Sequence, residues 1–422
     1  MTEAANLEKI VIAMAQDACD AAAGLLTLSR AEKDRALLRV AELLDRRRVT
    51  IQAENKKDLE AGRAKGLSLA MLDRLELSDK VIDSMISGLH EVCGLADPVG
   101  AVENLSLRPN GLQVGRMRVP LGVIAMIYES RPNVTIDAAA LCLKTGNAVI
   151  LRGGSEAIHS NIALAGLLQD ALADVGIHEK AVQVVPVTDR KAVHILLQQD
   201  EYIDLVIPRG GEGLIRSVSE SSRIPVLKHY KGVCHIYVDN DADLAKATPI
   251  ILNAKTQRPG VCNALEGVLV HQAVAEKYVP ELVKALTEAG VEVRGCEKSV
   301  ALNPLVKAAT NEDWGREFLD LVLVLKVVDG MGEAMAYIRR YGSQHTEVIL
   351  TENYTKARKF VAQVDASAVM VNASTRFNDG GQLGLGTEIG ISTTKLHAYG
   401  PMGLEELTTR KFVVFGEGQV RD

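Results

Sequence analysis

The chain has 422 residues, of which 47% are hydrophobic and 24% are charged, and its formal net charge at pH 7 is −6. This length exceeds what one hydrophobic core usually organises, so we expect a globular protein of at least two domains. The acidic balance and an aromatic content of only 4% argue against nucleic acid and anionic membranes as partners. Any phosphate that the chain binds must therefore be held by a local site.

The N-terminus and the cysteines indicate the compartment. The first residues are partly acidic and lack the basic segment and apolar core of a signal peptide. The apolar runs are far shorter than the roughly 20 residues of a membrane span. The six cysteines are scattered without CxxC spacing, which fits reduced thiols better than disulfides or a zinc site. We expect a cytoplasmic protein with no membrane partner and no metal.

The first 95 residues are predicted to be helical. Residues 30–46 show the apolar spacing of three to four residues that is typical of an amphipathic helix. Residues 105–119 differ, because alternating side chains flank Asn110-Gly111, a strong turn signal. This segment is predicted to be a β-hairpin.

From residue 119 onward, predicted strands alternate with helices. The strands are expected at 122–128, 148–152, 181–185 and 204–207 and, in a second series, at 267–271, 320–324, 347–350 and 368–372. Such alternation implies parallel sheets covered by helices on both faces. We therefore predict an α/β protein with two doubly wound lobes, parallel-rich sheets and a β-hairpin.

Cys262 is the first candidate for chemistry. Pro259-Gly260 breaks regular structure just before it, so the thiol is expected on a turn. Lys255 and Arg258 are close in sequence and would favour the reactive thiolate. Free cysteines are, however, usually buried and inert, and the neighbouring Val261 is compatible with that alternative. The local sequence leaves both interpretations open.

Two glycine-bearing loops follow predicted strands, at Gly153-Gly154 and at Gly210-Gly211. Such turns can leave backbone N–H groups free for a phosphate at a helix N-terminus. Arg152 and Arg209, beside the loops, could grip that phosphate. Neither loop matches GxGxxG, and a simple tight turn explains each loop equally well.

Asn133 follows the strand predicted at 122–128. Its amide could donate to a developing oxyanion. Alternatively, Asn133 could merely cap the next helix. His229, His235 and His397 are conceivable proton carriers, but isolated histidines are more often structural, and they are assigned no role.

Longer segments carry a resemblance to a known family. They include both glycine loops and the turn around Cys262, and they occur in order over nearly the whole chain, at 120–124, 128–137, 144–156, 208–215, 255–266, 377–381, 385–394 and 400–404. Through them the chain resembles the aldehyde dehydrogenase superfamily, and within it the branch that reduces an acyl phosphate.

The resemblance implies roles for individual residues. Cys262 would be the nucleophile, and the Asn133 amide and the Cys262 backbone N–H would form the oxyanion hole. Arg258 or Lys255 would neutralise the leaving phosphate. Asn372 and Arg376, on a loop after a late strand, are candidates for binding the rest of the substrate, together with Ser374. NADPH would be bound by Arg152, Gly153, Gly154 and Ser155 near the adenosine ribose, Gly210 and Gly211 near the pyrophosphate, and Glu317 on the nicotinamide ribose.

One departure from the superfamily narrows the reaction. Hydrolytic members carry Glu-Leu-Gly-Gly-Lys, whose glutamate activates water, whereas residues 226–237 here read Val-Leu-Lys-His-Tyr-Lys-Gly-Val-Cys-His-Ile-Tyr. An enzyme whose acyl acceptor is phosphate needs no such base. The resemblance thus implies NADPH-dependent reduction of L-glutamyl 5-phosphate to L-glutamate 5-semialdehyde, with phosphate release, through a Cys262 thioester in L-proline biosynthesis. The alternatives are another acylating or a non-phosphorylating aldehyde dehydrogenase, or a catalytically silent nucleotide-binding protein.

The same resemblance implies an organisation and partners. Residues 1–104 and 120–232 would bind NADP, and 233–399 would form the catalytic domain. Residues 105–119 and 400–422 would form an oligomerisation flap, making the chain a homo-oligomer, either a dimer or a dimer of dimers. Glutamate 5-kinase is a candidate partner for passing on the labile acyl phosphate. Arg152 favours NADP over NAD, whereas Glu156 nearby counts against that preference.

Overall fold

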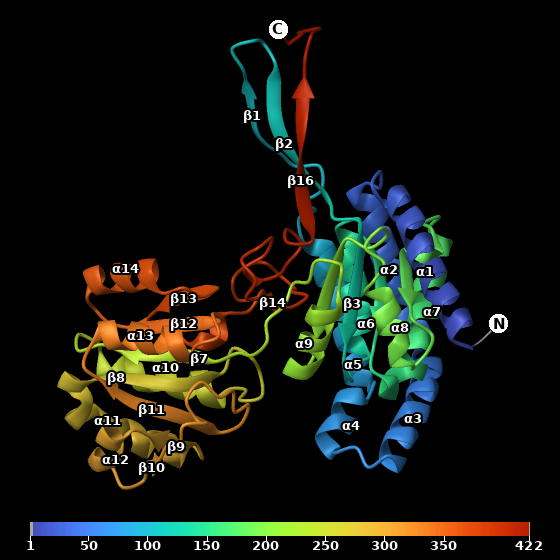
Figure 1. Ribbon diagram of the computed structural model, residues 1–422. Coiled ribbons are helices and arrows are strands. Elements are labelled where there is room, and N and C mark those ends of the chain that lie inside the picture. Colours follow the sequence, from blue (N-terminus) through green and yellow to red (C-terminus); the bar gives the residue numbers. More distant parts are fainter. Residues whose placement is uncertain (1–2, 422) are drawn as a thin grey trace. The chain divides into compact units, whose positions relative to one another are not determined.

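The computed structural model describes residues 3–421, so residues 1, 2 and 422 of the predicted terminal segments lie outside the described part. The chain divides into two compact units (Figure 1). Unit 1 contains residues up to Lys228 together with 385–390 and the segment from Met402 onward, and unit 2 contains 229–384 and 391–401. Both units are α/β structures with parallel sheets, so the predicted fold class is confirmed.

The N-terminal helices of unit 1 form as the apolar spacing predicts. They are α1 (Glu3–Leu25), α2 (Arg30–Arg46), α3 (Arg48–Ala64), α4 (Leu69–Leu75) and α5 (Asp79–Gly94). Helix α2 begins with a capping box in which Ser29 and Glu32 satisfy each other's backbone N–H groups. Its apolar stripe, which includes Leu37, Val40 and Leu44, is buried.

The parallel sheet of unit 1 has the strand order β5-β4-β3-β6. Its elements are β3 (Val123–Tyr128), β4 (Ala148–Arg152), β5 (Val182–Val184) and β6 (Leu205–Arg209), with α6 (Asn133–Lys144), α7 (Ile158–Asp174), α8 (Arg190–Leu196) and α9 (Glu212–Ser221) between or after them. The strand order reverses at β3, which pairs with β4 on one side and β6 on the other. Ligands of such sheets bind at this switch point, beyond the carboxyl ends of the strands.

A three-stranded antiparallel sheet projects from unit 1 (Figure 1). It consists of β1 (Val102–Leu107), β2 (Gln113–Pro120) and β16 (Thr408–Phe415). The turn between β1 and β2 uses the predicted Asn110-Gly111 pair, with Gly111 at a φ of 86° that favours glycine. The predicted hairpin therefore forms, and the C-terminal strand extends it. We call these three strands the flap.

Unit 2 has a seven-stranded parallel sheet in the order β10-β9-β11-β8-β7-β12-β13. The strands are β7 (Cys234–Val238), β8 (Leu265–His271), β9 (Glu292–Gly295), β10 (Lys307–Ala308), β11 (Val322–Val328), β12 (Thr346–Leu350) and β13 (Ala368–Val371). Strands β7, β8, β11 and β12 supply apolar residues to two separate cores. The sheet is therefore buried on both faces, as a doubly wound lobe requires.

The helices of unit 2 cover opposite faces of this sheet (Figure 1). One core includes α10 (Leu244–Thr256), α11 (Gln272–Glu288) and α12 (Glu297–Leu302). The other includes α13 (Met331–Tyr341) and α14 (Tyr354–Gln363). The short strands β14 (Ile391–Ser392) and β15 (Gly400–Pro401) form a separate pair. Within the described residues, no helix is both long and apolar enough to cross a membrane.

The unit boundaries differ in detail from the predicted domain limits. The chain passes from unit 1 to unit 2 after Lys228, whereas the predicted NADP-binding domain extends to residue 232. Residues 385–390, predicted in the catalytic domain, belong to unit 1 because the Ile389 backbone N–H donates to the Met402 carbonyl and its own carbonyl accepts from Arg209. The assignment of a cofactor to one unit and catalysis to the other stays a prediction.

Candidate active site

Cys262 lies on the turn that connects α10 to β8, and its side chain is half-buried. The turn is closed by a hydrogen bond of 3.0 Å from the Ala264 N–H to the Val261 carbonyl. Gly232 packs so closely on this turn that a Cβ there would lie 1.9 Å from the Cys262 carbonyl oxygen. Only glycine fits at position 232, and its close contact restricts the position of the Cys262 backbone. The predicted turn is confirmed.

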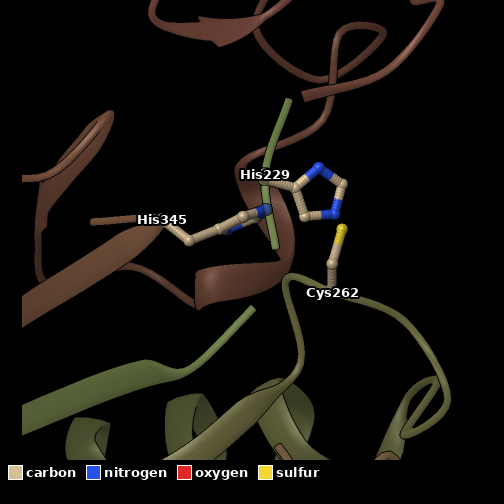
Figure 2. Close-up of side chains that lie close together, drawn as sticks. All are labelled: His229, Cys262 and His345. Carbon is tan, nitrogen blue, oxygen red and sulfur yellow. The ribbon is translucent and has the colours of Figure 1, made fainter. Parts of the chain in front are cut away.

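Two histidines lie beside the sulfur. The ligand atoms of His229, Cys262 and His345 are all within 4.8 Å of one another, and Figure 2 shows a ring nitrogen of His229 facing the Cys262 sulfur. The other nitrogen, Nδ1, lies 2.8 Å from the Ile391 carbonyl oxygen. A carbonyl can only accept, so Nδ1 carries the proton and Nε2 of the neutral ring keeps a lone pair toward the sulfur. This geometry suits proton transfer from the thiol.

His345 differs from His229 because it is fully buried. Its Nδ1 lies 2.8 Å from Thr346 Oγ1, while its Nε2 has no hydrogen-bond partner. Burial, assisted by the nearby His229, lowers the pKa of His345 to about 3. The ring is therefore neutral at physiological pH.

Two guanidinium groups accompany the thiol. Arg258 is exposed on the same loop, and Arg376 lies in the short 3₁₀ helix Thr375–Phe377, where its Nε donates to Gln257 Oε1 at 2.8 Å. Burial lowers the pKa of Arg376; Asp379 opposes this shift, and the charge of Arg258 adds to it. Cys262 also acts on this pKa, so the two arginines and the thiol share one electrostatic environment. Two such guanidinium groups can bind a phosphate dianion.

Lys255 is not placed like Arg258. Its side chain is fully buried, and its Nζ lies 2.8 Å from Glu266 Oε2 on β8. Burial lowers the pKa of Lys255 and raises that of Glu266 to about 7, although each partner opposes the shift of the other. A buried, paired ammonium is poorly placed to meet a substrate phosphate. We therefore keep Arg258, and not Lys255, as the candidate phosphate ligand.

Asn372 and Ser374 are engaged in holding their own loop. The Asn372 side chain bridges the backbone of Thr351, accepting from its N–H and donating to its carbonyl, both at 2.9 Å. Ser374 Oγ accepts from the Arg376 N–H at the start of the 3₁₀ helix. These contacts are structural and leave Arg376 as the stronger substrate-binding candidate on this loop.

Glu317 lies in unit 2, close to the Cys262 turn. Its Oε1 accepts from the Gly232 N–H at 2.8 Å, so it braces the glycine on which the Cys262 turn packs. Its predicted contact with a nicotinamide ribose stays a prediction.

In unit 1, Asn133 is the first residue of α6, and its side chain caps nothing. Pro132 occupies the N-cap position, so the alternative that Asn133 is the cap is wrong. The Asn133 Nδ2 donates to Asp137 Oδ2 at 3.0 Å. Burial raises the pKa of Asp137 to about 6, against the influence of Arg209 and of Asn133 itself. The carboxylate thus holds the half-buried amide in one orientation and leaves its second N–H available.

In the loop after β4, neighbouring side chains pack so closely on the two glycines that a Cβ would not fit without movement. A Cβ at Gly153 would lie 2.1 Å from Asn161 Nδ2, and one at Gly154 would meet the Glu156 carboxylate. The Arg152 guanidinium donates to the carbonyls of Gly153 and Thr188 at 2.7 and 3.0 Å. Its Nε is buried without a partner, so one N–H of the guanidinium is not used within the described residues. Ser155 is exposed at the start of the 3₁₀ helix Ser155–Ala157.

The loop after β6 places Gly211 at the N-cap of α9. The Gly211 N–H donates to the Glu129 carboxylate at 3.0 Å, and a Cβ at Gly210 would collide with that side chain. An anionic group therefore already occupies the N-terminus of α9. Apart from its chain neighbours, no described atom lies within 4 Å of a Cβ at Gly211, so there is open space beside this glycine. The residues of unit 1 thus fit a nicotinamide nucleotide.

Sequence reasoning missed the roles of His345, Asp137 and Glu129, and left His229 unassigned. Asp137 follows Asn133 by four residues on one helix, so its contact with the amide could have been foreseen. His229 and His345 are far from Cys262 in sequence. They meet it only because β8, β7 and β12, the strands that follow these residues, are neighbours in the sheet. No local signal identifies them.

Comparisons with known proteins agree with this architecture. The aldehyde dehydrogenase family matches residues 2–318. The gamma-glutamyl phosphate reductase of Desulfotalea psychrophila is 64% identical over 99% of this chain and all of its own length, and that of Geotalea daltonii is 58% identical over the whole of both chains. The crystal structure of gamma-glutamyl phosphate reductase from Thermotoga maritima matches with a TM-score of 0.96 and 50% identity, covering 98% of this chain and all of that chain. The chain therefore belongs to the aldehyde dehydrogenase family and, within it, to the gamma-glutamyl phosphate reductases.

Proposed function

We propose that this chain reduces L-glutamyl 5-phosphate to L-glutamate 5-semialdehyde, with release of phosphate, in L-proline biosynthesis. The observation that carries the proposal is the surroundings of Cys262, which has a histidine base on one side and two arginines in the same electrostatic environment. The first arrangement generates a thiolate, and the second suits a phosphate leaving group. Full-length identity to gamma-glutamyl phosphate reductases supports the substrate class.

The first step is the attack of sulfur on the acyl phosphate. His229 Nε2 takes the thiol proton, while the bond from Nδ1 to the Ile391 carbonyl holds the ring and stabilises the imidazolium. The thiolate forms a C–S bond to the acyl carbon, and the C–O bond to phosphate breaks. Arg258 and Arg376 neutralise the departing phosphate, which takes the proton from His229 as it leaves. A thioester on Cys262 and inorganic phosphate result.

The second step reduces this thioester. A bound nicotinamide nucleotide supplies the hydride for it. The resulting thiohemiacetal oxyanion collapses and its C–S bond breaks. The semialdehyde is released, and Cys262 is again a thiolate. We propose the Asn133 amide, oriented by Asp137, and the Cys262 backbone N–H as the donors that stabilise the oxyanion in both steps.

The cofactor that we propose is NADPH. Arg152, Gly153, Gly154 and Ser155 would hold its adenosine ribose, and Gly210 and Gly211 its pyrophosphate at α9. Arg190 lies close enough to Arg152 that its charge lowers the pKa of Arg152, after the larger effect of burial and against the opposing charge of Glu156. Two neighbouring cations favour a 2′-phosphate. Arg190→Ala should raise the KM for NADPH about ten-fold and leave that for NADH nearly unchanged.

The Glu156 carboxylate, which could favour NADH by binding a ribose hydroxyl, is already hydrogen-bonded within the protein. Its carboxylate accepts from both the backbone N–H and the hydroxyl of Ser130. It is therefore engaged by neutral donors at the end of β3 and less available to a ribose. Equal use of NADH and NADPH by the unchanged chain would contradict the assignment.

We also propose that the flap joins copies of the chain. Large apolar side chains on it are exposed, including Leu107, Phe412, Val414 and Phe415. An exposed apolar sheet of this kind marks an interaction surface. Phe412→Asp with Phe415→Asp should shift the mass measured by light scattering to that of a single chain, and an unchanged mass would exclude the flap. A complex with glutamate 5-kinase stays a prediction.

The experiment that tests the reaction follows NADP⁺ reduction by glutamate semialdehyde. With phosphate or arsenate present we expect sustained NADPH formation. Formation of NADPH that depends on coenzyme A instead of phosphate would identify another acylating dehydrogenase. No turnover under any condition, with cofactor still bound, would identify a silent nucleotide-binding protein.

A further inference from the structure

We propose that Cys262, His229 and His345 form a binding site for a zinc-like cation that reversibly blocks the nucleophile. These three residues, which we call the Cys-His-His cluster, converge from the loops before β8, β7 and β12 (Figure 2). The cysteine spacing does not indicate a metal site, because the fold assembles the cluster from distant positions. The inhibitory consequence rests on the proposed role of Cys262, whereas the binding itself does not.

The distances in the cluster come close to those of a metal site. Its ligand atoms lie within 4.8 Å of one another. A tetrahedral zinc with bonds of about 2.0 Å to nitrogen and 2.3 Å to sulfur needs ligand atoms ~3.5 Å apart. Cys262 and His229 are only half-buried, so their side chains can adjust more readily than that of the buried His345, which provides a fixed point. The fourth position would be taken by water.

His345 supplies the observation that points to a ligand. Its Nε2 is buried and lacks any hydrogen-bond partner, and Figure 2 shows the ring directed toward the other two residues. An unpartnered polar nitrogen in the interior is costly unless a ligand satisfies it. The contact between Nδ1 and Thr346 fixes the ring, as outer hydrogen bonds do for metal-binding histidines.

The chemistry of the ligands selects the cation. One thiolate and two imidazoles suit Zn²⁺ and similar d-block ions and do not suit Mg²⁺ or Ca²⁺, which prefer oxygen. Binding would replace the thiol proton by a sulfur–metal bond and release that proton to solvent. The charges of Arg258 and Arg376 nearby would reduce the affinity but leave the ligands in place. A sulfur bonded to the metal cannot attack a substrate.

Equilibrium dialysis of the reduced full-length chain against Zn²⁺ tests the site. We expect one Zn²⁺ per chain at this site, lost in Cys262→Ser and weakened at least ~10-fold in His345→Gln, with no retention of Mg²⁺. His90→Gln, an exposed histidine of α5, is the matched control and should bind as the unchanged chain does. Binding that Cys262→Ser and His345→Gln leave intact would overturn the proposal.

A second measurement does not depend on catalysis. Zn²⁺ should slow the alkylation of Cys262 by iodoacetamide, and EDTA should restore the rate. If both variants lose their fold, as judged by thermal unfolding, this protection in the unchanged chain still decides the matter, and its absence would contradict the site. Zinc binding without reductase activity would remove the proposed function and leave the site standing.

Discussion

The two parallel sheets present their candidate residues at opposite edges. In unit 1, Asn133 follows β3, Arg152 ends β4 and Gly211 follows β6, at the carboxyl edge where α6 and α9 begin. In unit 2, His229, Cys262 and His345 precede β7, β8 and β12, at the amino edge. The same architecture therefore supplies two different chemical environments.

The difference follows from the direction of the helices. Helix N-termini at the carboxyl edge of a parallel sheet present N–H donors and partial positive charge, which suit the phosphates of a nucleotide. At the amino edge helices end, as α10 does at Thr256 before the Cys262 turn, and a helix C-terminus disfavours an anion. A thiolate there needs cationic or basic side chains. We propose that His229, Arg258 and Arg376 meet that need.

The sharpest test of the amino edge is Cys262→Ala. Turnover should fall by at least ~10⁴-fold, because the sulfur is the only proposed covalent carrier. NADPH binding, assigned to the carboxyl edge of unit 1, should be unchanged by calorimetry. Cys142→Ala and Cys296→Ala should stay active, and substantial turnover in Cys262→Ala would overturn the mechanism.

Asn133→Ala tests whether the carboxyl edge also contributes to catalysis. Loss of one oxyanion donor should lower kcat by about 10²–10³-fold with little change in substrate KM. Since Asn133 is not the cap of α6, thermal stability should change only slightly. A fall in stability with an unchanged kcat would assign Asn133 a structural role.

The sequence predicts some of the strands, turns and side chains at these two edges and not others. The strands β3, β4, β5, β6, β8, β11, β12 and β13 were predicted, and most of them are buried parallel strands with continuous apolar runs. Strand β7 was not, because His235 and the preceding polar segment hide it. The Cys262 turn was predictable from Pro259-Gly260. The histidine partners were not, because strand order, which no local pattern encodes, decides which loops meet.

The dependence of turnover on phosphate tests whether Arg258 and Arg376, at the amino edge, bind phosphate. Without phosphate, semialdehyde and NADP⁺ should give at most one NADPH per Cys262, since residues 226–237 lack the water-activating glutamate of hydrolytic relatives. Arg258→Ala and Arg376→Ala should each raise the KM for phosphate about ten-fold and that for semialdehyde less. Arg339→Ala, an exposed arginine of α13, is the control. Continuous NADPH formation without phosphate, with glutamate as product, would mean that the enzyme is hydrolytic.

The smallest expected effect concerns Asp137, the carboxylate that orients Asn133 at the carboxyl edge. Its folded pKa is raised from 3.8 to about 6 by burial, so between these values the folded chain binds more protons than the unfolded chain. Stability should therefore fall as pH rises from about 4 to about 6, by about 1–3 kcal/mol from this group. Asp137→Asn cannot titrate, so its melting temperature relative to the unchanged chain should rise over that interval. A melting-temperature difference that is constant from pH 4 to 7 would show that Asp137 has an ordinary pKa. Burial of the carboxylate that holds Asn133 would then not lower the free energy of unfolding.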